Sequence, residues 1–326
     1  MRGVFVSGCV PRVFAILLAA SAFLLPSAHA KGFPYTLDNC GDALLFDEAP
    51  QRVLVANTDP LVMLDALGEL GKVVAWTGLL SREAFTEEAL AKIESIPRLA
   101  MQYTATGGAA IGLETVLDVA PDLVLASEKS IDRQMLKNAG IAMFVSPALC
   151  LAAAQQLEAP ASFDLIFDYL NLYGRIFGVE QRAGHVVAGL KQDLEGVVAG
   201  SAERGTGLAL YLNPTGIVSA YGNRSMLQPM LEAVGIRNVY SHIDKRAFKP
   251  TLEDVLAQDP DHLVILYEGM EPEAALDLLG AVPGADQLKA VRSGKVMALP
   301  FPFTDPPTPL SIQGVMMLNA MLSEPA

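Results

Sequence analysis

Histidine is scarce in this sequence, and that scarcity limits the chemistry that the chain can perform. Of the four histidines in 326 residues, His29 lies in an N-terminal segment that we expect to be removed, and none lies between Lys31 and Cys150. Sites for bare zinc or manganese use two or more histidines with carboxylates, and a Ser-His-Asp triad requires a histidine beside its nucleophile. Only His242 falls in a plausible loop, where we expect it to be solvated. We therefore expect neither a naked metal-ion site nor a catalytic triad.

Nucleotide-binding and hydrolase motifs are also absent. No G-x-G-x-x-G follows an expected strand, and the sequence contains no G-x-x-x-x-G-K-[ST] and no G-x-S-x-G. The pair Gly107-Gly108 suits a flexible loop better than a phosphate cradle. We therefore expect no enzyme activity and no cofactor, with a secreted α/β enzyme that lacks a recognisable motif as the alternative.

Long apolar runs are confined to one segment near the N-terminus. Arg2 and Arg12 are the only charges before an apolar run from Val13 to Leu25, and Ala28-His29-Ala30 follows that run. This order of charge, apolar run and small residues predicts a cleavable secretory signal peptide over residues 1–30. A membrane anchor is the alternative, but the run is shorter than the ~20 residues of a spanning helix.

Cysteine is rare as well. Cys9 lies in Val6-Ser7-Gly8-Cys9, which resembles a lipoprotein cleavage box but precedes the apolar run, so we expect no lipid anchor. Cys40 and Cys150 remain after cleavage, and their spacing matches no metal motif. In an oxidising compartment they are either two separate thiols or one disulfide that ties the N-terminal strand to the end of the first lobe.

Basic residues are outnumbered in the mature chain. Removal of residues 1–30 takes away two arginines and no acidic residue, which leaves 21 basic against 36 acidic residues and a formal charge of −15. An acidic surface repels nucleic acid and anionic lipid, so we expect neither as a partner. No later segment reaches about 18 consecutive apolar residues, so we expect a soluble mature protein. Its length suits one large α/β domain or two lobes.

The mature chain alternates short apolar runs with helical patterns, which predicts strand–helix–strand units around mainly parallel sheets. Strands are expected over residues 52–56, 72–76, 122–126, 141–145, 208–212, 264–267 and 295–300, and helices over 60–70, 134–139, 227–234 and 311–322. Residues 162–198 give no strand signal but a continuous apolar stripe, which predicts a long helix, or two helices end to end, with a bend at Gly178. We therefore predict an α/β fold of two Rossmann-like lobes, residues 31–158 and 202–326, with a connecting helix over 159–201 and a ligand cleft between the lobes.

A repeated segment supports two lobes of similar build. Residues 113–125 and 252–265 each contain a Leu-Glu helix start, an apolar stripe, a Pro-Asp turn and a buried strand. Such an echo of one supersecondary unit indicates that the lobes share a common plan.

Side chains suited to ligand binding follow the expected strands. In open α/β sheets, ligands bind outside the carboxyl ends of the strands. Aromatic rings suit stacking on a flat ligand, and arginines can hold carboxylate or catecholate oxygens. The residues that we expect to line the cleft are Thr58, Trp76, Arg98, Tyr103, Asn213, Tyr221, Arg224, Arg246, Tyr267 and Phe301. Each has an alternative as a core aromatic or a solvated polar residue.

Together these features resemble the periplasmic binding proteins for iron–siderophores, haem and cobalamin, over nearly the whole mature chain. Tyr35-Thr-Leu-Asp-Asn-Cys-Gly41 and Phe46-Asp-Glu-Ala-Pro-Gln-Arg-Val53 resemble the N-terminal hairpin and first strand of the siderophore branch, and Ala66-Leu-Gly68 and the two repeated segments also match. The resemblance implies two α/β lobes joined by one rigid long helix, a small closing motion on binding, and the substrate-binding role of an ABC importer. It implies a periplasmic protein, expected to be a monomer, that delivers its ligand to a dimeric permease in the inner membrane.

The resemblance also implies roles for two glutamates and a ranking of ligands. In relatives, one exposed glutamate per lobe contacts arginine pockets of the permease, and Glu114 and Glu253 occupy the matching Leu-Glu positions. A carboxylate in the first turn of a helix is stabilised by the helix dipole and can pair with arginine, and helix capping alone is the alternative. The implied ligand is an iron–siderophore first, cobalamin second, and haem third, with Tyr103 as an axial ligand. A binding module that serves a sensor is a further alternative.

Overall fold

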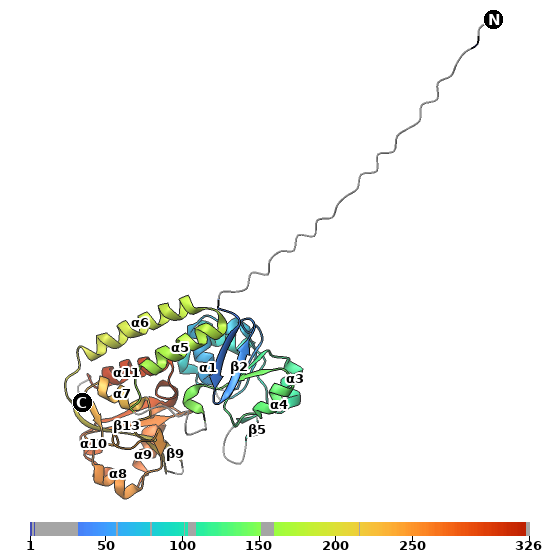
Figure 1. Ribbon diagram of the computed structural model, residues 1–326. Helices are drawn as coiled ribbons and strands as arrows, with labels where there is room; N and C mark the ends of the chain where they lie inside the picture. Colours follow the sequence, from blue (N-terminus) through green and yellow to red (C-terminus); the bar gives the residue numbers. More distant parts are fainter. Residues whose placement is uncertain are drawn as a thin grey trace.

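The computed structural model describes residues 1, 3 and 32–323, except residues 57, 79, 101, 104–108, 151–159 and 215. The predicted signal peptide of residues 1–30 lies outside the described residues apart from Met1 and Gly3. Within the described parts of the chain, no helix combines the length and apolar character needed to cross a membrane. These parts form two α/β lobes, with the helices α5 (Asp164–Phe177) and α6 (Glu180–Val198) lying along one side of the molecule (Figure 1).

The N-terminal lobe is built on a four-stranded parallel sheet. Its strands lie in the order β4 (Val73–Trp76), β3 (Val53–Val55), β7 (Leu123–Leu125) and β8 (Ala142–Phe144). Nearly all of their residues are buried, as expected for a parallel sheet that is covered on both faces. The helices of this lobe are α1 (Thr58–Ala66), α2 (Glu87–Ser95), α3 (Leu113–Val119) and α4 (Arg133–Asn138). Two hairpins complete it, β1 (Tyr35–Asn39) with β2 (Asp42–Phe46), and β5 (Gln102–Tyr103) with β6 (Ala109–Ala110).

A disulfide and a buried amide fix the first hairpin to the end of β8. Cys40 is bonded to Cys150, with 5.4 Å between their Cα atoms and a sequence separation of 110 residues. The Asn39 side chain donates a hydrogen bond to the Val145 carbonyl (2.8 Å) and accepts one from the Val145 amide (2.9 Å). A cross-link over so long a loop restricts the unfolded chain and typically stabilises the fold by about 2–4 kcal/mol.

The C-terminal lobe is built on a six-stranded mixed sheet. Its main strand order is β12 (Ala247–Phe248), β10 (Gly216–Tyr221), β9 (Gly205–Asn213), β13 (His262–Tyr267) and β14 (Val296–Pro300), and β11 (Ile236–Asn238) also pairs with β9. Three pairs are parallel, whereas β10 is antiparallel to both β9 and β12. The helices are α7 (Leu227–Ala233), α8 (Leu252–Gln258), α9 (Pro272–Gly280), α10 (Lys289–Arg292) and α11 (Pro309–Met321).

The connection between the lobes contains two helices instead of one continuous helix. The chain leaves α5 at Gly178, where φ is +68°, a left-handed conformation that glycine adopts without strain. The Val179 amide donates to the Gly174 carbonyl (2.8 Å) and closes the turn. From there α6 runs back beside α5 (Figure 1). The two helices expected as the alternative are therefore present, and they pack against each other instead of lying end to end.

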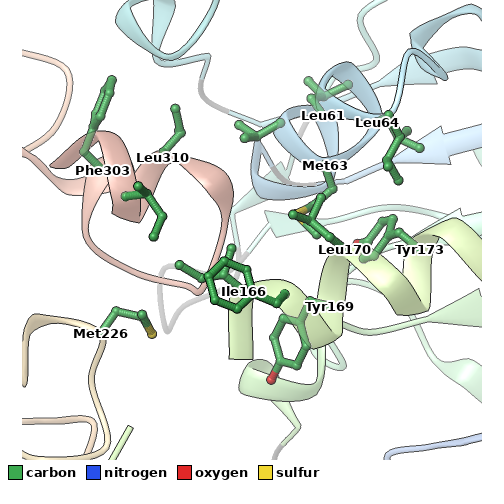
Figure 2. Close-up of a cluster of buried hydrophobic side chains, with 14 of the residues drawn as sticks. Leu61, Met63, Leu64, Ile166, Tyr169, Leu170, Tyr173, Met226, Phe303 and Leu310 are labelled. Carbon is green, nitrogen blue, oxygen red and sulfur yellow. The ribbon is translucent and has the colours of Figure 1, made fainter. Parts of the chain in front are cut away.

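One hydrophobic core joins the two lobes through α5. Leu61 and Leu64 of α1 pack in the same cluster as Ile166 and Leu170 of α5 and Leu310 of α11 (Figure 2). All of these side chains are 3% exposed or less, and α1 contacts both α5 and α11. Because the packing is continuous, the lobes share a stiff joint instead of two separate cores connected by a loop.

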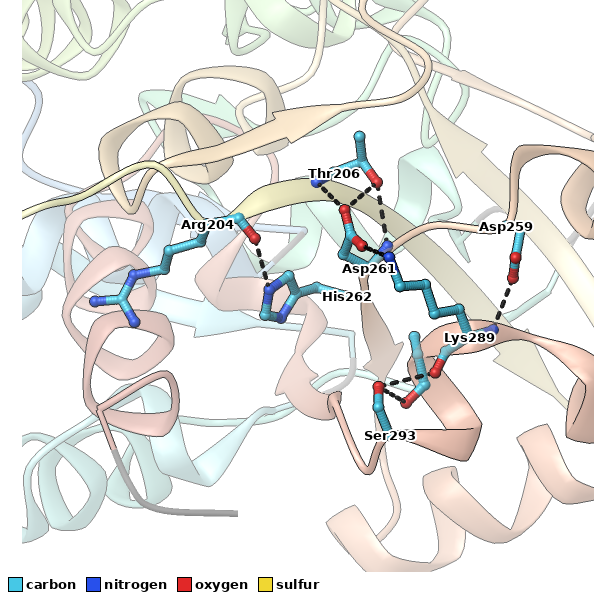
Figure 3. A network of polar contacts seen from close by, with 8 residues as sticks. Arg204, Thr206, Asp259, Asp261, His262, Lys289 and Ser293 are labelled. Carbon is cyan, nitrogen blue, oxygen red and sulfur yellow. Dashed lines mark hydrogen bonds and ion pairs between the residues drawn. The ribbon is translucent and has the colours of Figure 1, made fainter.

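A polar network ties the start of β9 to the start of β13 (Figure 3). The Asp261 carboxylate accepts hydrogen bonds from the amide and the hydroxyl of Thr206, both at 2.9 Å, and pairs with Lys289. Beside it, the Nε2 atom of the buried His262 donates to the Arg204 carbonyl at 3.1 Å. The network fixes the relative position of the two central strands of the sheet.

Acid is expected to weaken the fold through His262. Burial lowers the pKa of His262, and the hydrogen bond to Arg204 opposes this shift. The unfolded chain therefore binds this proton more readily than the folded protein, so stability is complete above about pH 6.5 and is lost as the pH falls below that value. We expect His262→Gln to show a smaller loss of unfolding free energy between pH 7.5 and 5.5, measured by urea denaturation. His185→Gln, at an exposed position on α6, is the control, and equal slopes in both variants would contradict this assignment.

Candidate functional site: a pocket between the lobes

A pocket of about 660 Å³ lies between the two lobes. The N-terminal lobe lines it with the segment that follows β4, and the C-terminal lobe lines it with the β13–α9 loop, the end of β14 and one residue of α11. The lining residues are Leu80, Ser81, Arg82, Glu83, Tyr267, Glu268, Gly269, Met270, Glu271, Pro272, Pro300 and Met317. We call this the inter-lobe pocket. It lies at the carboxyl ends of strands, where α/β sheets bind ligands, and its volume is in the usual range of about 300–1,000 Å³.

The inter-lobe pocket is acidic. Glu83, Glu268 and Glu271 line it, and Arg82 is the one basic residue among the lining residues. Arg82 is paired with Glu94, so its charge is already balanced. Burial raises the pKa of Glu268, and the negative charge of Glu83 raises it further. A pocket of this charge favours neutral or cationic ligands over polyanions.

Three aromatic rings of the C-terminal lobe lie close together, and one of them, Phe301, directly follows Pro300 of the pocket lining. The Phe301 ring lies 5.4 Å from the Tyr211 ring and 6.5 Å from the Tyr221 ring, measured between centroids. We call these three residues the aromatic cluster. Tyr211 of β9 is paired with Leu266 of β13, and Leu266 lies two residues before Glu268 in the sequence. Burial raises the pKa of Tyr211, and the charge of Glu268 contributes to that rise. Tyr211 therefore lies near Glu268, whereas the Tyr221 ring is buried, with only 4% of the residue exposed.

A buried ion pair lies behind the aromatic cluster. The Asp305 carboxylate is fully buried and pairs with the Nε atom of Arg246, whose side chain is 34% exposed. Burial raises the pKa of Asp305, and the Arg246 charge opposes this rise. The same carboxylate contributes to the raised pKa of Tyr221, which is due chiefly to burial. Arg246 is thus oriented by Asp305 beside the aromatic cluster, instead of being a freely mobile cation.

Two of the predicted cleft residues are engaged with each other. Trp76 is only 4% exposed, and its Nε1 atom donates to the Ile93 carbonyl at 3.2 Å. The Arg98 guanidinium lies 5.0 Å from the centre of the Trp76 ring and donates to the Gly78 carbonyl at 2.7 Å. The prediction that Trp76 stacks on a ligand is therefore wrong for this structure, because the ring belongs to the core and Arg98 lies over it.

The other predicted residues are divided among several places. Tyr221 and Phe301 meet in the aromatic cluster beside Arg246, and Tyr267 lines the inter-lobe pocket. Asn213 lines a smaller pocket of about 390 Å³ on the C-terminal lobe, so its predicted contact with the ligand stays a prediction.

Three more predicted residues have a less defined relation to the site. Thr58 is the first residue of α1 and is half-buried, and Arg224 is half-buried after β10, where its amide donates to the Lys245 carbonyl at 3.3 Å. The side chain of Tyr103 lies outside the described residues, so its predicted role as a ligand contact stays a prediction.

Sequence reasoning missed Tyr211, Glu83 and Asp305. Tyr211 is the seventh residue of β9, and it was not predicted because it lies inside the strand, whereas candidates were chosen from residues at strand ends. Glu83 lies seven residues after β4 in a short helical turn, and only the assembly of the two lobes brings it opposite Glu268.

Glu114 and Glu253 occupy equivalent places in the two lobes. Each is the second residue of a seven-residue helix, α3 and α8, and each is exposed. The helices lie at the outer ends of their lobes, away from α6 (Figure 1). Each helix is followed by a residue with left-handed backbone conformation, Ala120 (φ +50°) after α3 and Asp259 (φ +34°) after α8, and then by a Pro-Asp turn.

The repeated Pro-Asp turns also perform the same structural task. The Asp122 carboxylate accepts hydrogen bonds from the Gln51 and Arg52 amides (2.7 and 3.0 Å), just before β3. Asp261 does the same for the Thr206 amide at the start of β9. In each lobe the turn therefore fixes the start of the neighbouring strand, and the sequence echo is a structural repeat.

Two α/β lobes with a pocket between them, at the ends of their strands, define a two-lobed ligand-binding protein. Residues 53–302 match the family model described as periplasmic binding protein, and the chain belongs to this family of substrate-binding transport proteins. The family places the protein outside the cytoplasm.

Individual relatives agree with this assignment. A substrate-binding lipoprotein of an ABC transporter from Bacillus subtilis is 22% identical over 74% of this chain and 72% of its own. The crystal structure of an ABC-type Fe³⁺-hydroxamate transport system from Saccharomonospora viridis is 37% identical, with a TM-score of 0.82 over 90% of this chain and all of that one. The periplasmic haem-binding protein RhuT of Roseiflexus sp. shares the fold, at 20% identity and a TM-score of 0.65 over 83% of this chain and 97% of its own.

Proposed function

We propose that this protein captures a ferric hydroxamate chelate and delivers it to the permease of an ABC importer. The observation that carries the proposal is the acidic inter-lobe pocket beside the aromatic cluster. Three hydroxamate groups cancel the charge of Fe³⁺, whereas three catecholates leave the complex strongly anionic and would be repelled by Glu83, Glu268 and Glu271. The 37% identical relative in a Fe³⁺-hydroxamate transport system supports the same ligand class.

In this role the protein binds and releases its ligand without chemical change. The aromatic cluster provides apolar contact for the hydrocarbon backbone of the chelate, and Arg246 provides donors for hydroxamate oxygens. Glu114 and Glu253 present one carboxylate from each lobe to the permease. The mature protein begins near Lys31, after cleavage of the leader, and acts as a monomer in the periplasm.

Calorimetric titration of the mature chain tests the ligand class. The panel contains ferric hydroxamates, ferric catecholates, ferric citrate, cobalamin, haem, and free ferric and zinc ions. We expect saturable binding of at least one intact ferric hydroxamate at one ligand per protein, and no binding of free ions. Heat is the preferred signal, because the buried Trp76 reports on a ligand only indirectly. Binding of haem or cobalamin alone would assign the protein to another branch of the family, and no binding at all would reject the proposal.

A further inference from the structure

We propose that the preferred ligand carries a protonated amine and that Glu83 and Glu268, one from each lobe, bind this amine in the inter-lobe pocket. This inference rests on the proposed function and specifies its ligand further: a chelate with a neutral ferric hydroxamate core and a cationic tail. The pocket has a volume of about 660 Å³ and is lined by residues of both lobes.

The two glutamates belong to different lobes, so a cationic ligand tail between them would contact both lobes. Glu83 lies in the helical turn Arg82–Ala84 of the N-terminal lobe, and Glu268 directly follows β13 of the C-terminal lobe. Both line the same pocket together with Glu271. Within the described residues none of these three glutamates takes part in an ion pair. Two carboxylates that meet across a pocket repel each other, and a cation between them removes that repulsion.

The neighbouring groups reinforce this charge distribution. Tyr267 lines the same pocket, and burial raises the pKa of its hydroxyl, with further contributions from the charges of Glu83, Glu271 and Glu273. The single basic residue that lines the pocket, Arg82, is held by Glu94. An ammonium group that enters the pocket therefore meets negatively charged carboxylates. Among the lining residues it meets no cation without an ion-pair partner.

The position of the aromatic cluster indicates where the ferric hydroxamate core and the cationic tail of the ligand would bind. Pro300 lines the pocket and directly precedes Phe301 of the cluster. Tyr211 of the cluster is close enough to Glu268 for that charge to affect its pKa. The bulky core can therefore contact the aromatic rings while a flexible tail extends towards Glu83 and Glu268.

The inference also predicts a contribution to lobe closure. Only a ligand with a positive tail bridges both glutamates, so it stabilises the closed arrangement more than a neutral ligand of equal size. The preference for the cationic chelate should decrease as salt is added, because Glu83 is exposed and its charge is screened.

A matched pair of ligands tests the inference. Ferrioxamine B is a linear ferric trihydroxamate with one terminal ammonium group, and its N-acetyl derivative has the same core without the charge. We expect calorimetry to show that the wild-type protein binds the ammonium form about tenfold more tightly. In the double variant Glu83→Gln with Glu268→Gln, the ratio is expected to fall to about one, with the affinity for the acetylated form unchanged. Glu195→Gln, at an exposed position on α6, is the control and should keep the full ratio.

Each outcome separates this inference from the proposed function. Equal affinity for the two forms in the wild type, or a full preference retained by the double variant, would overturn the role of the glutamates while leaving hydroxamate capture intact. Failure of folded wild-type protein to bind either form, or any other ferric hydroxamate, would reject the proposed function and with it this inference.

Discussion

Import is expected to fall about a hundredfold when Glu114 and Glu253 are both replaced by arginine, while ligand affinity stays within about twofold of the wild type. The two carboxylates are exposed at equivalent positions of α3 and α8, and neither residue lines the inter-lobe pocket. If each pairs with an arginine of the permease, charge reversal converts two attractions into two repulsions, and we expect a loss of transport on the order of a hundredfold. Uptake of radiolabelled iron chelate by cells, and calorimetry of the purified variant, measure the two quantities.

The control for charge reversal is a second double variant with the same change in net charge. Glu87→Arg combined with Glu195→Arg alters two exposed glutamates on α2 and α6, and we expect transport close to the wild-type rate. Single reversals should give intermediate losses if each lobe contacts one permease subunit. Undiminished transport by the Glu114→Arg, Glu253→Arg variant would show that these residues only cap their helices.

The second large effect is expected from Arg246→Met, which should destabilise the fold by about 3 kcal/mol at neutral pH. This change leaves the fully buried Asp305 without its charged partner. Burial then raises the pKa of Asp305 above that of the unfolded chain, so the folded state binds a proton more readily. The stability of this variant is therefore greatest below the usual aspartate pKa near 4, and it is lost as the pH rises and Asp305 must ionise in the folded protein. Urea denaturation should therefore show a smaller deficit at pH 5 than at pH 8.

A compensating variant distinguishes the buried charge from lost packing. Arg246→Met combined with Asp305→Leu removes both charges, and we expect it to be more stable at neutral pH than Arg246→Met alone. Arg98→Met removes an exposed arginine from the face of Trp76 and should cost less than about 1 kcal/mol. A pH-independent deficit in Arg246→Met would mean that the carboxylate of Asp305 is not the cause.

The regular parts of the fold could be predicted from the sequence because they follow from local periodicity. The strands expected over 122–126 and 141–145 are β7 and β8 with one residue less at each end, and the helix expected over 227–234 ends one residue earlier. The strands β10 and β12 were not predicted. β12 is only two residues long, and both strands gain their structure from antiparallel pairing, β10 with β9 and β12 with β10.

The candidate site was less predictable for a different physical reason. Aromatic residues at strand ends were identified, and Tyr221, Phe301 and Tyr267 lie in or beside the site. Trp76 was placed in the cleft because it ends a strand, but the direction of its ring is set by packing against residues from other parts of the chain, which sequence periodicity does not encode. The acidic character of the pocket depends on Glu83 and Glu268, which are separated by most of the chain and meet only when the lobes assemble.

The repeated Pro-Asp unit has a consequence for the evolution of the protein and its partner. Two helices with the same exposed glutamate, each fixed by the same turn to the same edge of its sheet, are the expected product of duplication of one ancestral half. A single chain whose two lobes are related by an approximate twofold repeat can bind a partner made of two identical subunits. Each subunit then contacts nearly the same surface. Mutations that improve one half of such a contact are then selected in both subunits at once, which favours keeping the two lobes alike at their outer ends while the pocket between them diverges.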